Sequence, residues 1–137
     1  MLNIIAAVMV MFVQGASGDI IIRDQWMRPG AKDMNTAMYM NIVNNNTEAD
    51  TLYRAECGAA YKTELHETFR SGDEMGMRHT PAIAIPGKST YRFAPGGHHV
   101  MLIGLKAKIS PGSKQEVTLY FRKAGKIKIN VPVKKQT

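Results

Sequence analysis

Apolar and polar residues alternate with a period of two along most of this chain, and turn-forming residues separate the alternating segments. Successive side chains of a β-strand point to opposite faces of a sheet, so this period is typical of half-buried strands. No long stretch holds the i, i+3, i+4, i+7 spacing of an amphipathic helix. The pattern predicts an all-β domain with strands over residues 20–27, 37–43, 51–56, 62–69, 75–79, 89–93, 99–105, 116–121 and 126–133.

Nine short strands joined by turns predict two sheets packed face to face, a Greek-key β-sandwich. The 137 residues, of which 45% are hydrophobic and 21% charged, suit one globular domain with one core. The last two strands should form a hairpin, in which Pro132 belongs near an edge or a strand end because it has no amide hydrogen for the ladder. The inward-facing residues of this hairpin are expected to be Val117, Leu119, Phe121, Ile127, Ile129, Val131 and Val133.

The first eighteen residues differ from all that follow, because residues 2–13 are apolar except for Asn3 and no charged residue precedes Asp19. This segment resembles a secretory signal peptide, although it lacks the usual positively charged start. The apolar run is short against the about 20 residues of a membrane-spanning helix, so an uncleaved anchor is the weaker alternative. We expect a signal peptide over residues 1–18, cleaved after Ala16 or Gly18. The domain over 19–137 should then be periplasmic, without stable membrane insertion.

The chain has a single cysteine, Cys57, so it cannot form an internal disulfide. A zinc or iron–sulfur site built on cysteines would lack its usual number of ligands. Cys57 lies in residues 52–60, which are predicted as strand and turn, and we expect it to be a small buried hydrophobic residue and not a reactive thiol.

The formal charge of +7 is concentrated in the C-terminal third, where residues 101–137 carry nine Lys or Arg against Glu116 alone. Lysines occupy every second position from Lys126 to Lys128 within the last predicted strand, which indicates the solvated face of that strand. No aromatic residues alternate with these lysines as a stacking platform, and the chain resembles an exported protein. Both features argue against a nucleic-acid partner.

Seven methionines follow the signal-like segment. Met34, Met38 and Met40 are expected to fill an apolar core. Three others, Met75, Met77 and Met101, are distinguished by nearby histidines.

His99 and Met101 are separated by one residue in the strand that follows Pro95-Gly96-Gly97. The pleat points both side chains to the same face, so they can hold one ion together. Val100 and Leu102 should point the other way, into the core.

His66 lies in another predicted strand, and the turn-like residues 71–73 can fold the next strand back on it as a hairpin. Met75, Met77 and His79 alternate, so they share one face of that strand. Any of them could reach His66, and the spacing alone does not choose among them.

Two imidazoles with two thioethers form a meaningful set of metal ligands. Thioether sulfur is a soft donor that favours copper(I), while imidazole suits copper in either oxidation state. Zinc would prefer thiolate or carboxylate to methionine. Methionine also forms no disulfides in an oxidising compartment, which suits an exported copper(I) protein.

The spacing of four of these residues resembles a family signature. Ten residues separate His66 from Met77, 21 separate Met77 from His99, and one separates His99 from Met101. This resembles the H-x10-M-x21-H-x-M pattern of the periplasmic copper chaperone A family, PCuAC. Similar flanking sequences extend the resemblance over residues 19–137: Trp26-Met27-Arg28, Leu65-His66-Glu67, Met75-Gly76-Met77-Arg78, Pro95-Gly96-Gly97-His98-His99-Val100-Met101-Leu102 and Gly104-Leu105-Lys106.

The resemblance implies a cupredoxin-like β-sandwich that binds copper(I) through His66, Met77, His99 and Met101. It selects Met77 over Met75 and His99 over His98. It also implies a copper chaperone and not an enzyme, which transfers copper(I) by ligand exchange during cytochrome oxidase assembly. The acceptor would be the oxidase copper centre or a Sco-type protein. Because the sequence ends without a tail rich in His and Met, we expect no second copper site there.

The residues are also compatible with two alternatives. A cupredoxin-type electron carrier needs a cysteine thiolate beside the histidines, and Cys57 has no ligand-like neighbours. An exported β-sandwich module for binding or assembly would use the His and Met residues only for packing. Binding of copper(II) at His79 or His98 is also open.

Overall fold

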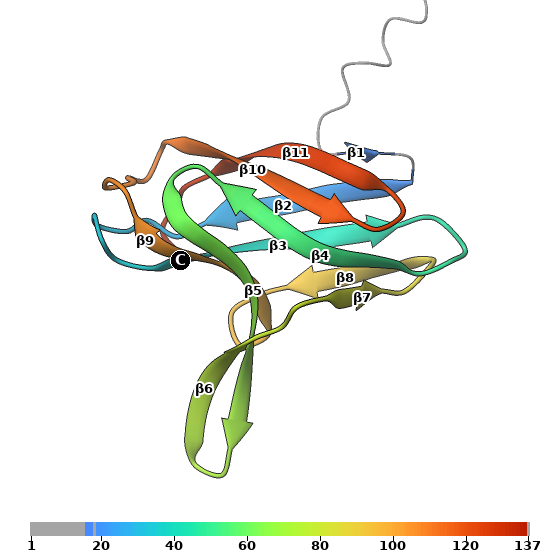
Figure 1. Cartoon of the computed structure of the whole chain (residues 1–137), viewed down its shortest axis with the longest axis horizontal. Helices are drawn as coiled ribbons and strands as arrows, with labels where there is room; N and C mark the ends of the chain where they lie inside the picture. Colours follow the sequence, from blue (N-terminus) through green and yellow to red (C-terminus); the bar gives the residue numbers. More distant parts are fainter. Residues whose placement is uncertain (1–15, 18, 137) are drawn as a thin grey trace, which may run out of the picture.

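A computed structural model describes residues 16–17 and 19–136, which form only strands, turns and loops (Figure 1). The predicted signal peptide therefore lies outside the described residues, except for a two-residue strand, and stays a prediction. The strands are β1 (Ala16–Ser17), β2 (Ile20–Met27), β3 (Thr36–Asn44), β4 (Asp50–Cys57), β5 (Ala60–Ser71), β6 (Glu74–His79), β7 (Ile83–Ile85), β8 (Ser89–Phe93), β9 (His98–Leu105), β10 (Lys114–Phe121) and β11 (Gly125–Pro132).

These strands form two antiparallel sheets, which confirms the predicted all-β sandwich. The larger sheet has the order β1-β2-β3-β9-β5-β6, and β8 pairs with β3 beyond the end of β9. The smaller sheet has the order β11-β10-β4-β7. In the part of the chain that the structure describes, no helix is long and apolar enough to cross a membrane.

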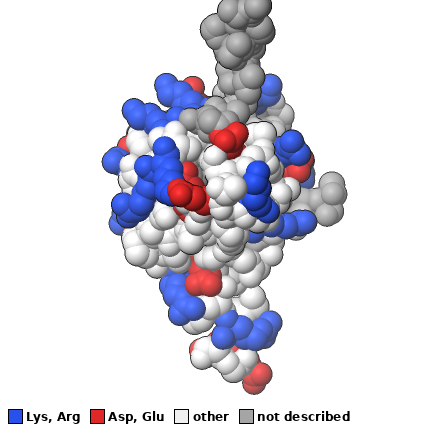
Figure 2. Space-filling model, turned by 90° about the vertical axis from the view of Figure 1, so that its right-hand side faces the viewer, with Lys and Arg blue, Asp and Glu red and all other residues white. Residues whose placement is uncertain are grey.

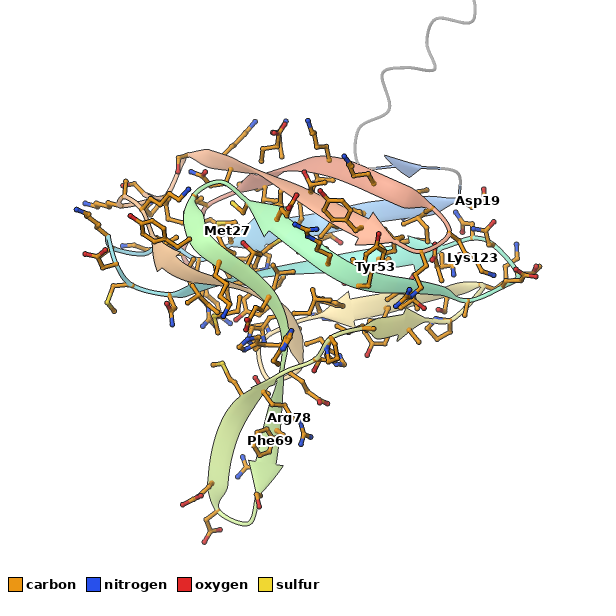
Figure 3. The ribbon with its side chains drawn as sticks, viewed as in Figure 1. Asp19, Met27, Tyr53, Phe69, Arg78 and Lys123 are labelled. Carbon is orange, nitrogen blue, oxygen red and sulfur yellow. The ribbon has the colours of Figure 1, made fainter. Side chains whose placement is uncertain are left out.

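The core lies between the two sheets, where the apolar faces of the alternating strands meet. Met38 and Met40 are buried in it as predicted, and so is Met27, which Figure 3 labels. The prediction for Met34 is wrong, because this side chain is 58% exposed in the turn before β3. Alternation cannot locate a residue that lies outside any strand.

The β10–β11 hairpin agrees with its prediction, since all seven inward-facing residues are buried. Pro132 ends β11, and β11 is an edge strand of the smaller sheet. Lys126 and Lys128 point outward from the same strand and are exposed. Figure 2 shows Lys and Arg side chains spread over one side of the molecule, not gathered into one patch.

Strand β5 connects the sandwich with a hairpin that projects from it (Figure 1). Its first part pairs with β9 as far as Glu67, and its last part pairs with β6 from His66 onward. On one face of this hairpin the Arg78 guanidinium lies 4.4 Å from the centre of the Phe69 ring, and both residues are labelled in Figure 3. Arg78 also forms an ion pair with Glu67, at 3.3 Å. These contacts occupy one face and leave the other for Met77 and His79.

Candidate metal centre

Strands β5 and β9 bring two sequence-distant segments together at the base of the hairpin. The register pairs His66 with His99 and Glu64 with Met101. Directly opposite residues of an antiparallel pair point to the same face, so these four side chains share one face. The intervening pair of Leu65 and Val100 is buried in the core. The four side chains therefore lie on the outer face of the larger sheet.

The two histidines are neighbours on this face, with ring centroids 5.8 Å apart. His99 is almost completely buried, at 2% exposure, and the His66 side chain is 15% exposed. Each ring has one buried nitrogen without a hydrogen-bond partner among the described residues, Nδ1 of His66 and Nε2 of His99. Buried polar atoms are normally paired, so two unpartnered nitrogens on neighbouring rings indicate a site for a ligand.

The other nitrogen of each ring has a hydrogen-bond acceptor. Nε2 of His66 lies 2.8 Å from Oε1 of Glu64, and Nδ1 of His99 lies 3.3 Å from the carbonyl oxygen of Gly97. In a neutral imidazole one nitrogen carries the hydrogen and the other carries a lone pair. In each ring the nitrogen that faces an acceptor carries the hydrogen. The unpartnered nitrogen therefore carries the lone pair and is able to bind a metal.

The surroundings of His99 keep its ring neutral. Burial lowers the pKa of His99, and the hydrogen bond to the Gly97 carbonyl opposes this shift only in part. The Tyr39 ring packs beside it, with centroids 6.2 Å apart, and the Arg28 guanidinium lies 5.3 Å from the Tyr39 ring. Burial in turn raises the pKa of Tyr39. A metal ligand must be deprotonated, so a lowered histidine pKa favours binding near neutral pH.

Met101 is buried at 8% exposure and lies between Glu64 of β5 and Ala37 of β3. Its thioether shares the sheet face with both histidines. The structure therefore brings three of the four predicted ligands together, because β5 and β9 are adjacent in the sheet.

Met77 is placed differently. It lies on β6 opposite Thr68, on the same face as His66, but it is 57% exposed on the projecting hairpin. In a flat sheet its Cα would lie roughly 16 Å from that of Met101, from two strand spacings of about 4.8 Å and four steps of about 3.3 Å. Binding of one ion by both thioethers therefore requires the hairpin to curl toward β9.

Sequence spacing could not exclude Met75, His79 and His98 as metal ligands, and the structure places these three residues differently. His79 lies opposite His66, with ring centroids 6.1 Å apart, while Met75 is farther out and 60% exposed. His98 points to the other face, where its Nδ1 lies 2.9 Å from the Tyr91 hydroxyl. Among the described residues, no three His, Cys, Asp or Glu side chains converge as a metal site.

Glu64 is the residue that the sequence reasoning missed. It lies two positions before His66 in the same strand, so alternation alone places both on one face. The hydrogen bond from His66 is the main cause that lowers the pKa of Glu64. The carboxylate is therefore ionised beside the candidate ligands.

Comparison with known proteins shows similarity to a family of lipoproteins and to solved PCuAC domains. The family model for LpqE-like lipoproteins matches residues 20–133. The protein Lxx21020 of Leifsonia xyli subsp. xyli, named a lipoprotein, is 36% identical over 80% of this chain and 66% of its own. The chain spans only 66% and 62% of the length of the two curated relatives that it matches.

Two similar solved structures contain copper. The copper-bound PCuAC domain from PmoF2 is 29% identical, covers 88% of this chain and 97% of its own, and has a TM-score of 0.73. The solution structure of CuI-DR1885 from Deinococcus radiodurans is 27% identical, covers 95% of this chain and 87% of its own, and has a TM-score of 0.66.

Proposed function

Because this chain belongs to the LpqE-like family, which is the PCuAC family, we propose that it binds one copper(I) ion on the outer face of its larger sheet. The ligands we propose are His66, Met77, His99 and Met101. The observation that carries the proposal is the pair of buried, unpartnered imidazole nitrogens of His66 and His99, on the sheet face that Met101 shares.

The ligand set favours copper(I) over other biological metals. Two thioethers select a soft ion such as copper(I). Two imidazoles also bind copper(I), but they suit several other metals as well. A thioether carries no proton, and burial lowers the pKa of His99, so binding by these ligands is compatible with neutral pH.

The difference in exposure between the ligands suits a carrier. His99 and Met101 are shielded from solvent, whereas Met77 is exposed and lies on the hairpin. An incoming ligand of an acceptor can displace Met77 first, and the remaining ligands can follow one at a time. We propose that the protein transfers copper(I) by this ligand exchange and catalyses no reaction.

We further propose that the protein works in the periplasm. The signal-like segment over residues 1–18 supports export, and the lipoprotein names of the family and of a relative are consistent with it. The acceptor we propose belongs to cytochrome oxidase assembly, either the oxidase copper centre or a Sco-type protein. Copper transfer to each purified acceptor would test this.

The position of Cys57 supports a carrier over a blue-copper electron-transfer protein. Cys57 lies in β4 of the smaller sheet and is buried, whereas the candidate ligands lie on the outer face of the larger sheet. Burial also raises the pKa of the Cys57 thiol, which disfavours the thiolate that a blue-copper site needs.

Titration with copper(I) in the presence of a competing chelator tests the proposal. We expect one equivalent to be retained in a colourless complex, with two nitrogen and two sulfur neighbours in the X-ray absorption fine structure. Retention that is unchanged in both His99→Ala and Met101→Ala would contradict the ligand assignment.

A further inference from the structure

Lys62, Glu64 and His66 alternate along β5, so their side chains lie in a line on the sheet face that carries the candidate ligands. Both oxygens of the Glu64 carboxylate are engaged, since Oε1 lies 2.8 Å from His66 Nε2 and Oε2 lies 3.2 Å from Lys62 Nζ. The Glu64 side chain is only 20% exposed. A carboxylate held at both oxygens and partly shielded from water has a fixed orientation toward His66.

This orientation determines which nitrogen of His66 carries the hydrogen. An ionised carboxylate can only accept hydrogen bonds, so Nε2 of His66 must donate to it. The neutral ring then has its lone pair on Nδ1, and Nδ1 is the buried atom without a partner among the described residues.

His99 has the opposite arrangement. The Gly97 carbonyl oxygen also can only accept, so it fixes the hydrogen on Nδ1 of His99. The lone pair of this ring is then on Nε2, which is its buried, unpartnered atom. The two histidines therefore leave different ring nitrogens available to bind a metal.

We propose that Glu64 is a positioning residue that makes His66 bind copper(I) through Nδ1, while His99 binds through Nε2. This inference rests on the proposed copper(I) site. Carboxylates and carbonyls that hold the second nitrogen of a metal-bound histidine fix its tautomer and raise its basicity. The Glu64 carboxylate also supplies a negative charge near the ion, because it lies directly opposite Met101. The neutral imidazoles and thioethers themselves give copper(I) no counter-charge.

The tautomers can be measured without copper. Long-range ¹H–¹⁵N correlation spectra of the ¹⁵N-labelled full chain, recorded above the pH at which the histidines protonate, distinguish protonated from unprotonated ring nitrogens. We expect hydrogen on Nε2 of His66 and on Nδ1 of His99. A His66 ring with its hydrogen on Nδ1 would overturn the proposal, and this result needs no variant.

Addition of one equivalent of copper(I), which is diamagnetic, should then shift the resonance of His66 Nδ1 more than that of His66 Nε2. A larger shift at Nε2 would overturn the assignment of the donor atom.

Two variants separate the tautomer from the charge. Glu64→Ala should give mixed His66 tautomers and weaken copper(I) retention about tenfold, as loss of an outer-shell partner does. Glu64→Gln should retain the tautomer, because its amide oxygen still accepts, and should weaken retention less. The His99 tautomer should not change in either variant.

Glu67→Gln is the matched control, because Glu67 is adjacent to His66 and ion-paired with Arg78 but points to the other face. If Glu64→Ala weakens retention no more than Glu67→Gln, the proposal is wrong. A wild-type chain that retains no copper(I) would instead contradict the proposed function, while the tautomers measured in the copper-free chain would still be informative about Glu64.

Discussion

The candidate site joins two regions of the molecule that are stabilised in different ways. The β5–β9 region is part of the sandwich, and Leu65, Val100 and Leu102 pack into the core between the candidate ligands, so His66, His99 and Met101 have fixed neighbours. The β5–β6 hairpin projects from the sandwich and is stabilised mainly by its own ladder and by the contacts of Arg78. Local stability follows the density of buried contacts. The comparison indicates a preorganised part of the site and an adaptable part.

The largest expected effect is in the preorganised part. His99→Ala should weaken copper(I) retention by more than the about 10- to 100-fold that loss of an outer-shell partner costs, because it removes a ligand itself. Competition with a copper(I) chelator measures this. His98→Ala is the control, since His98 points to the other face. Equal losses in the two variants would show that the faces are wrongly assigned.

The hairpin should contribute less. Met77→Ala should weaken retention by only about tenfold, because ordering an exposed side chain and its hairpin offsets part of the gain from the Cu–S bond. Stopped-flow transfer to a chelator should show faster release. Met75→Ala, from the same strand and face, should change neither quantity. A Met77→Ala loss as large as that of His99→Ala would contradict the division into two parts.

Sequence alone predicted most of the strands and only half of the site geometry. Alternation found nine strands, eight of which pack one face on the core, whereas β6 alternates on the exposed hairpin. It missed the two-residue β1 and the three-residue β7, which are too short to show a period. The shared face of His99 and Met101 followed from the strand period. The contact of His66 with His99 could not be predicted from this period, because it depends on the pairing of β5 with β9 across 33 positions of sequence.

Hydrogen exchange should sharpen the comparison in the copper-free chain. Amides of β6 and of the turn at Gly72 should exchange faster than those of β9, whose hydrogen bonds lie within the sandwich. One equivalent of copper(I) should slow exchange in the hairpin, because Met77 then ties it to β9. Exchange followed by mass spectrometry measures both. Hairpin exchange that is unaffected by bound copper(I) would contradict a role for Met77.

The smallest effect concerns pH. Burial lowers the folded-state pKa of His99 below its ordinary value of 6.5, so the unfolded chain binds a proton first as the pH falls. The contribution of neutral His99 to the free energy of unfolding is therefore fully present above about pH 6.5. It is lost as the pH falls toward the folded-state pKa, by at most about 1.4 kcal/mol per pH unit. Urea unfolding of the copper-free chain at several pH values measures this. His99→Phe should reduce the slope in this window, and an unchanged slope would assign it to other groups.

The central claim is that copper(I) unites the two regions in one site. Spectra of the chain labelled with ¹³C at the methionine methyl groups test this directly. One equivalent of copper(I) should shift the methyl signals of Met77 and Met101 together and leave those of Met34 and Met75 in place. A Met77 signal that does not move while that of Met101 does would contradict the claim.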